Sequence, residues 1–261
     1  MIHLAIDPVA LSLGPLAVRW HGLAVAAAVL LAVAVAECRA RRAGLDGEHV
    51  RGGAVWAVAA GLLGARLLHV VDQLDFYLNN PAAILALHEG GAAVLGGVLL
   101  GSAAAGLYAR RAALPFWPIA DVAAPALALG LAAGRIGSLI AGDAAGAPAT
   151  LPWAVVYDRA DTLVPTALRG VPTHPYPVYE LLWDLGIVAA LALWGRRLRP
   201  DGLRFLAFLN LYAAGRMVLT FYRDERVVLW GLQHAQVVAL LTLAVTLPLL
   251  ARRWRERAPG G

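Results

Sequence analysis

Seven stretches of about 20 mostly apolar residues are the feature that most limits how this chain can fold. A helix needs about 20 residues to cross a hydrocarbon layer about 30 Å thick. The stretches cover residues 16–37, 52–71, 91–109, 119–141, 178–195, 203–222 and 232–251. They are too long and too continuous for the alternating strands of a membrane barrel. The sequence therefore predicts an all-α integral membrane protein with about seven transmembrane helices.

Composition agrees with this fold class. The chain of 261 residues is 60% hydrophobic and 15% charged, whereas soluble domains are about 45–50% apolar. No internal repeat or polar linker divides it, so we expect a single membrane-embedded domain over residues 1–261. The first apolar stretch follows Asp7 and Pro8 rather than a basic segment, so we expect it to stay in the mature chain. A single cysteine, Cys38, excludes an intrachain disulfide and a CxxC motif, and we expect no metal and no cofactor.

The distribution of arginine predicts the orientation. All 22 basic residues are arginines. The loops after the first, third and fifth stretches, together with the C-terminal tail, hold 14 of them, whereas the opposite loops hold four. Since basic residues concentrate on the cytoplasmic side, the C-terminus is predicted to be cytoplasmic and the N-terminus outside. Basic residues there also suit anionic lipids, so the net charge of +5 indicates membrane lipid rather than nucleic acid.

The longest connection, residues 142–177, lies outside in this topology, between the fourth and fifth helices. It is rich in proline, tryptophan and tyrosine, as in "LPWAVVYDRADTLVP" and "THPYPVYE". Connections of this length in compact proteins are usually functional. We therefore expect an outward-facing lid or a small extracytoplasmic head.

Three arginines lie well inside the apolar stretches, away from their first residues: Arg66, Arg135 and Arg216. An arginine at such a position costs several kcal/mol, so it normally faces a cavity, a partner or a headgroup. All three fall toward the outer half of the membrane in the predicted topology. Because guanidinium groups match phosphate through a planar fork of donors, the three predict an outer-leaflet cavity for a phosphate-bearing lipid headgroup.

Simpler alternatives remain for each arginine. It can extend to the membrane surface, or it can pair with a carboxylate, for which the candidates are Asp72, Asp121, Asp143 and Glu180. A glycine also precedes each arginine closely, at positions 64, 134 and 215. Such small residues let helices pack tightly or leave room for a ligand. The glycine-rich stretches "GRIGSLIAGDAAG" (134–146) and "EGGAAVLGGVLLG" (89–101) likewise allow either tight helix packing or close approach of the backbone to a ligand.

Seven segments carry a family resemblance, and they follow one another over nearly the whole chain. In order they are "AVRWHGLAV", "GLLGARLLHVV", "HEGGAAVLGGVLLG", "DVAAPALALGLAAGRIGSLIAGDAAG", "THPYPVYELLWD", "LYAAGRMVLTFYRDE" and "GLQHAQVVAL". In this order they resemble the prolipoprotein diacylglyceryl transferase family. The resemblance implies a multi-pass enzyme of the bacterial plasma (inner) membrane. Its partners would be phosphatidylglycerol and the signal peptide of a prolipoprotein, whose lipobox cysteine receives the diacylglyceryl group as a thioether while glycerol phosphate leaves.

The resemblance also implies roles for individual residues. Arg135 and Arg216 match the two essential arginines of the family and are expected to be catalytic. The expected headgroup-binding residues are Arg66, Arg135, Ser138, Gly142, Asp143, Gly146, Arg216 and Arg223. The expected supporting residues are Asp121, Tyr179, Glu180, Gly96 and Gly97.

The chain departs from the family at several polar positions. Leu95 replaces a histidine, Ser138 and Ala141 replace asparagines, Asp143 replaces a glutamate and Thr220 replaces another. In addition, a histidine, His21, stands where the family has a tyrosine. An imidazole can accept a proton near neutral pH, so we predict His21 as the catalytic base that compensates for Leu95. Alternatively, His21 is an ordinary interfacial histidine. An alternative for the whole chain is a divergent relative that binds phospholipid but uses another acceptor or no longer catalyses transfer.

Overall fold

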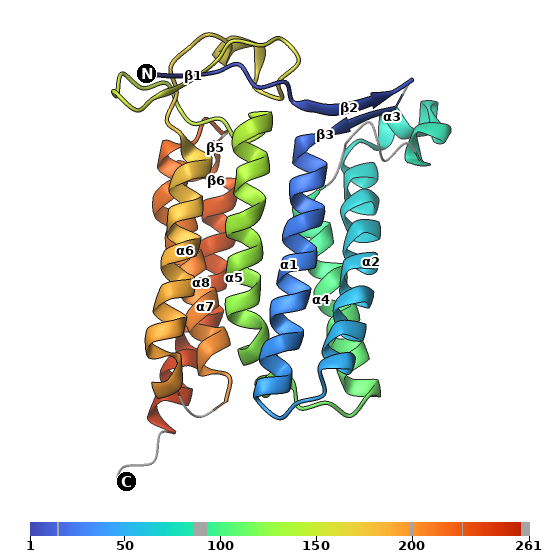
Figure 1. Ribbon diagram of the computed structural model, residues 1–261, viewed down its shortest axis with the longest axis vertical. Helices are drawn as coiled ribbons and strands as arrows, with labels where there is room; N and C mark the ends of the chain where they lie inside the picture. Colours follow the sequence, from blue (N-terminus) through green and yellow to red (C-terminus); the bar gives the residue numbers. More distant parts are fainter. Residues whose placement is uncertain (15, 86–92, 199–200, 226, 257–261) are drawn as a thin grey trace. The chain divides into compact units, whose positions relative to one another are not determined.

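Helices dominate the computed structural model of the chain (Figure 1). It describes residues 1–256 apart from 15, 86–92, 199–200 and 226. Six helices of the described residues are long and apolar enough to cross a membrane: α1 (Trp20–Arg42), α2 (Gly47–Asp72), α5 (Phe116–Ala141), α6 (Tyr176–Trp194), α7 (Leu203–Leu219) extended by the 3₁₀ turn η5 (Thr220–Tyr222), and α8 (His234–Arg255). The predicted all-α membrane protein is confirmed at this level.

The remaining predicted stretch, residues 91–109, corresponds to α4 (Val94–Arg111), a helix of 18 residues that is not among the six. Residues 91 and 92 lie outside the described part of the chain. A seventh transmembrane helix therefore stays a prediction. The first stretch also starts differently from expectation, because Leu16–Arg19 form strand β3, which pairs with β2 (Val9–Leu13), and α1 begins only at Trp20.

Contacts divide the chain into two compact units, residues 33–119 and residues 1–32 with 120–261. In the first unit, α2 and α4 lie side by side, and α3 (Leu74–Asn79) and the 3₁₀ helix η1 (Pro81–Leu85) follow α2. A Cβ atom on Gly64 would overlap the carbonyl oxygen of Gly96, and one on Gly97 would lie 3.2 Å from the carbonyl oxygen of Gly61. The absence of side chains thus lets the two backbones touch. Gly96 and Gly97 therefore serve helix packing in this unit.

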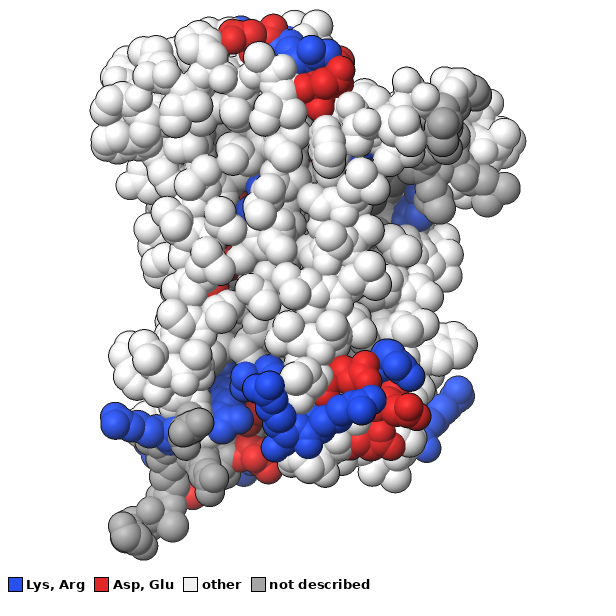
Figure 2. Space-filling model, viewed as in Figure 1, with Lys and Arg blue, Asp and Glu red and all other residues white. Residues whose placement is uncertain are grey.

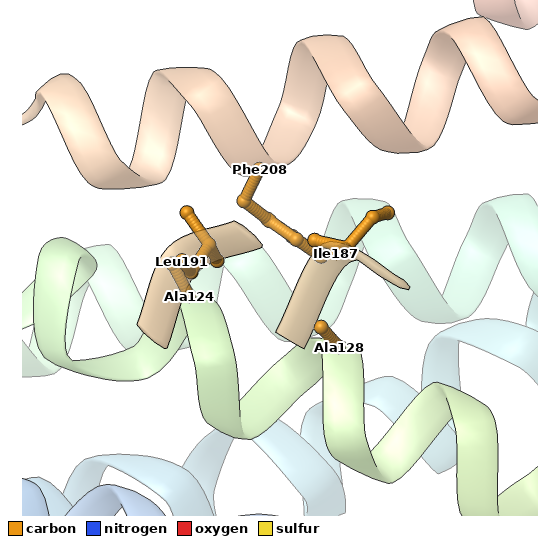
Figure 3. Close-up of a cluster of buried hydrophobic side chains, with 5 residues drawn as sticks. All are labelled: Ala124, Ala128, Ile187, Leu191 and Phe208. Carbon is orange, nitrogen blue, oxygen red and sulfur yellow. The ribbon is translucent and has the colours of Figure 1, made fainter. Parts of the chain in front are cut away.

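In the second unit, α5, α6 and α7 pack around a small apolar core (Figure 3). Ala124 and Ala128 of α5 face Ile187 and Leu191 of α6 and Phe208 of α7. Alanine keeps α5 close to its larger neighbours. Outside such cores, large apolar side chains cover the helices, and Figure 2 shows charged groups gathered mainly at the ends of the helices. Such exposed apolar surface suits lipid contact.

The 142–177 connection is folded rather than a simple tether. It contains strand β4 (Val155–Tyr157) and the 3₁₀ helix η3 (Thr166–Leu168). Strand β1 (Ile2–Leu4) pairs with β4 in parallel, and Leu4 packs on a buried cluster that includes Val155 and Tyr157. A second hairpin, β5 (Val227–Leu229) with β6 (Leu232–Gln233), leads into α8. The short 3₁₀ helix η4 (Gly195–Arg197) follows α6.

Asp121, a predicted supporting residue, caps the start of α7. Its carboxylate accepts hydrogen bonds from the backbone N–H groups of Gly202 and Phe205, both at 2.8 Å. Gly202 has no side chain and a φ of 95°, so it cannot cap the helix itself. Asp121 is buried, and it therefore satisfies helix donors that would otherwise lack partners.

Replacing Asp121 by alanine is expected to lower the free energy of unfolding by about 1–2 kcal/mol, because α7 loses its N-cap acceptor. Thermal unfolding of the purified protein in detergent measures this effect. Asp201→Asn is the matched control, since Asp201 is exposed and adjacent to the same helix start. Equal stability losses in the two variants would contradict the capping role.

Candidate active site

Two predicted catalytic arginines meet at one carboxylate. Arg135 of α5 places Nη1 2.8 Å from Oε2 of Glu180 on α6. Arg216 of α7 contacts the other carboxylate oxygen, Oε1, through its own Nη1. Glu180 is only 3% exposed at its side chain, whereas the arginines are 19% and 17% exposed. The carboxylate is thus the buried centre, and the guanidinium groups are more accessible.

Tyr176 completes this cluster at the first turn of α6. Its hydroxyl donates to Oε1 of Glu180 and accepts from Nη1 of Arg216, both at 2.9 Å. The guanidinium of Arg223 lies 5.6 Å from the centre of the Tyr176 ring and 3.6 Å from a carboxylate oxygen of Glu225. Tyr176 was not among the residues predicted from the sequence, although its spacing of four residues from Glu180 places both on one helix face.

The arginine donors of the cluster suit an anion. Arg135 and Arg216 share Glu180 as their directly paired carboxylate among the described residues. Asp184, one turn further along α6, is buried, and its Oδ2 atom has no hydrogen-bond partner among the described residues. Each arginine carries five donors in a planar fork and pairs with Glu180 through one nitrogen. The remaining donors suit a phosphate group.

The end of α5 continues from Arg135 toward the head. Ser138 is buried, and its carbonyl accepts a hydrogen bond of 2.8 Å from the N–H of Gly142, which ends the helix with a φ of 74°. A Cβ atom on Gly142 would overlap Val164, and one on Gly146 would overlap His174. Both glycines therefore serve a turn or a close approach of the backbone. Their contact with a headgroup stays a prediction.

A matched pair of glycines separates backbone strain from overlap. Gly142 and Gly170 both have a φ above 70°, but the space beside Gly170 is open. We expect Gly170→Ala to lower the free energy of unfolding by about 1 kcal/mol through the left-handed backbone alone. Gly142→Ala should cost about 2–4 kcal/mol, because overpacking is added. Chemical denaturation in detergent measures both, and equal costs would refute the packing argument.

His21 and Asp143 lie together beside the end of α5. Nδ1 of His21 is 3.7 Å from Oδ2 of Asp143, and both side chains are about one-third exposed. A Cβ atom on Gly137 would lie 3.2 Å from Cα of His21, so this glycine brings α1 close to α5. The charge of Asp143 also adds to burial in raising the pKa of Tyr157. The pair gives His21 a carboxylate partner that sequence analysis did not foresee.

Arg66 belongs to the unit of residues 33–119 and binds backbone there. It donates to the carbonyl oxygens of Ile84 at 3.0 Å and Ala83 at 2.5 Å, and its guanidinium lies 5.4 Å from the ring centre of Tyr77. Arg66 thus organises the segment that follows α3. A shared site with Arg135 and Arg216 stays a prediction.

Tyr179 lines an apolar groove of about 930 Å³ along α6 and α7. Its hydroxyl accepts from Nε1 of Trp153 at 3.1 Å and lies 3.2 Å from Nδ1 of His174. The rings of His174 and Tyr222 pack on Tyr179 edge to face. Tyr176, Tyr179 and Glu180 thus all lie in the first two turns of α6.

A protein-family model decides the identity. It is described as prolipoprotein diacylglyceryl transferase and matches residues 8–252. The chain belongs to this family. Among similar prolipoprotein diacylglyceryl transferases, one from Nostoc sp. is 33% identical over 97% of this chain and 91% of its own. Another, from Symbiobacterium thermophilum, is 37% identical over 98% and 96%. A third, from Synechococcus elongatus, is 36% identical over 91% and 84%.

All three relatives carry the name phosphatidylglycerol–prolipoprotein diacylglyceryl transferase. As a member of the prolipoprotein diacylglyceryl transferase family, the chain is a transferase enzyme of lipoprotein biosynthesis. Its six long apolar helices make it a multi-pass membrane protein. A phospholipid-binding relative without transferase activity is not favoured, since named transferases match it over nearly its whole length.

Proposed function

We propose that this protein transfers the diacylglyceryl group of phosphatidylglycerol to the lipobox cysteine of a prolipoprotein signal peptide. The convergence of Arg135 and Arg216 on Glu180 within apolar helices carries this proposal. Partly exposed guanidinium groups among apolar helices suit the phosphate of a lipid headgroup, and phosphatidylglycerol is the lipid that the name of the relatives gives. Membrane lipid is thus substrate as well as surroundings, and nucleic acid has no role.

The proposed reaction is a displacement at carbon. The cysteine sulfur attacks the diacylglyceryl carbon bound to the phosphate oxygen, the carbon–oxygen bond breaks, and glycerol phosphate leaves. Arg135 and Arg216 hold the phosphate and stabilise the negative charge that grows on the leaving group. Arg223 supports the headgroup together with Ser138, Gly142, Asp143 and Gly146. Glu180 and Tyr176 orient the arginines.

His21 is the proposed base that takes the thiol proton. Its Nδ1 atom lies 3.7 Å from Oδ2 of Asp143, a charge contact rather than a hydrogen bond; in the proposed scheme the carboxylate favours a proton on Nδ1, and Nε2 is then the acceptor. A thiolate is the effective nucleophile. In this scheme the substrate supplies the nucleophile, and Asp143 orients the imidazole.

In the proposed topology, α4 is the seventh transmembrane helix. The N-terminus and the head of residues 142–177 face outward, and the C-terminus is cytoplasmic, in agreement with the arginine distribution. The whole chain forms one membrane-embedded domain in the bacterial inner membrane. The arginine cluster then lies near the outer leaflet, where a signal peptide presents its cysteine after export.

Complementation tests the function. The gene is expressed in bacteria depleted of their own diacylglyceryl transferase, and lipid modification of a reporter prolipoprotein is followed by its gel mobility and mass. We expect growth and a mass increase equal to one diacylglyceryl group. Well-inserted protein that gives neither, and that also fails to modify a lipobox peptide in phosphatidylglycerol vesicles, contradicts the proposal.

Replacing His21 by phenylalanine is expected to lower the transfer rate about 10²-fold or more, since general base catalysis contributes about 10²–10⁴-fold. Binding of phosphatidylglycerol should stay unchanged, because the arginines are intact. Transfer and lipid binding are measured on the same purified variant, with His3→Phe as an exposed control on the head. Full activity of His21→Phe would rule out the base.

A further inference from the structure

The indole ring of Trp183 packs against the backbone of α7 at Gly215. A Cβ atom at position 215 would overlap Nε1 and Cδ1 of that ring. The indole N–H donates a hydrogen bond of 3.0 Å to the carbonyl oxygen of Leu211. Trp183 of α6 therefore lies directly on the backbone of α7, at a place that admits only glycine without rearrangement.

This contact is next to the arginine cluster on both helices. Trp183 follows Glu180 by three residues, about one helical turn, and Gly215 immediately precedes Arg216. The carbonyl of Leu211 is also the acceptor for the N–H of residue 215 in a regular helix. The indole thus adds a hydrogen bond at the turn from which Arg216 projects.

This contact of Trp183 with Gly215 limits how α7 can rotate or slide against α6. Glycine inside a helix is about 1 kcal/mol less favourable than alanine. Gly215 therefore lowers the stability of α7 locally, and the close contact with Trp183 explains why a glycine stands there. Arg216 then reaches Tyr176 and Glu180 on the facing helix. A shift of about 1 Å in such a group can lower a rate by about 10²-fold.

We propose that Trp183 is a positioning residue. By packing on the backbone of α7 at Gly215, it holds Arg216 at Glu180 and hence at the substrate phosphate. The role rests on the proposed function, in which Arg216 binds that phosphate. Trp183 itself touches no reacting atom. Its indole is partly exposed, and its exposed edge lines the groove along α6 and α7.

Four variants test the role: Gly215→Ala, Trp183→Phe, their double variant, and Gly186→Ala as the control. Gly186 lies on α6 three residues after Trp183, with open space around it. We expect Gly215→Ala to lower kcat by about 10- to 100-fold and to weaken binding of phosphatidylglycerol. Trp183→Phe should lower kcat about threefold to tenfold. The KM for the lipobox peptide should stay within twofold of wild type in every folded variant.

The double variant makes the test specific. A phenylalanine at position 183 lacks Nε1, the atom nearest to an alanine Cβ at position 215, and its smaller ring can turn away, so the double variant should lose no more activity than Trp183→Phe alone. The positioning role would be overturned if the loss of kcat in the double variant equalled the product of the two single losses. It would also be overturned if Gly186→Ala lost as much activity as Gly215→Ala. A general folding defect would lower the yield of folded protein but leave kcat per folded enzyme unchanged, and this result would also overturn it.

Lipid binding separates this inference from the proposed function. Binding of phosphatidylglycerol is titrated in detergent micelles, with phosphatidylcholine as the comparison lipid. Wild-type protein that binds phosphatidylglycerol but transfers nothing contradicts the function alone. A Gly215→Ala variant that binds and transfers like wild type contradicts the positioning role alone.

Discussion

Replacing Arg216 by alanine is expected to lower the rate of diacylglyceryl transfer by about 10²–10³-fold, the usual cost of one donor to a developing charge. The guanidinium would be lost from the phosphate, while Arg135 would keep its contact with Glu180. Transfer from phosphatidylglycerol to a lipobox peptide in vesicles measures the effect, with rates divided by the amount of folded enzyme. Arg216→Lys should recover only part of the rate, because lysine lacks the planar fork.

Arg159→Ala is the control for loss of one arginine. Arg159 pairs with Asp7 and Asp161 at the surface of the head, away from α7 in the chain. Its loss should change the transfer rate less than twofold, since surface ion pairs contribute little. If Arg216→Ala behaved like this control, the arginine cluster would not be the phosphate site.

Replacing Glu180 by glutamine is expected to lower the free energy of unfolding by about 3–5 kcal/mol, the range for breaking a buried ion pair. Glu180 is 3% exposed and serves both Arg135 and Arg216, so its loss leaves two guanidinium groups without a directly paired carboxylate among the residues that the structure describes. Equilibrium unfolding in a denaturing detergent mixture measures the change. Glutamine keeps the size and helix preference of the glutamate side chain, so the decrease in the free energy of unfolding measures the loss of the negative charge.

Glu225→Gln is the matched control, because it removes one carboxylate from a longer and more exposed pair with Arg223. We expect it to change stability by less than about 1 kcal/mol. Inorganic phosphate should stabilise the Glu180→Gln variant more than wild type, since an anion replaces the missing charge. Equal stability of the two glutamine variants would show that Glu180 does not hold the cluster together.

The apolar context of the arginines made them predictable. Arg135 and Arg216 are conspicuous because charge is costly in a membrane helix, and Glu180 was already one candidate partner. Tyr176 and Trp183 were not predicted as part of the cluster. An aromatic residue near a membrane surface is common for reasons unrelated to any site, so the sequence did not distinguish them.

The glycines show the same limit. Their sequence context allowed either tight packing or room for a ligand. In the structure, protein occupies the space beside Gly64, Gly142, Gly146 and Gly215. Whether a glycine faces a backbone, a side chain or a cavity depends on residues far away in the chain, so local patterns could not decide it.

The sequence by itself determined that the chain is a helical membrane protein, because helix length and apolarity are local properties set by the thickness of the bilayer. It also identified the arginines inside apolar stretches as charges that need a partner or a ligand. Only the tertiary structure decided their partners. Ion pairs such as Arg135 with Glu180, and contacts such as Trp183 with Gly215, join separate helices whose packing no local pattern encodes.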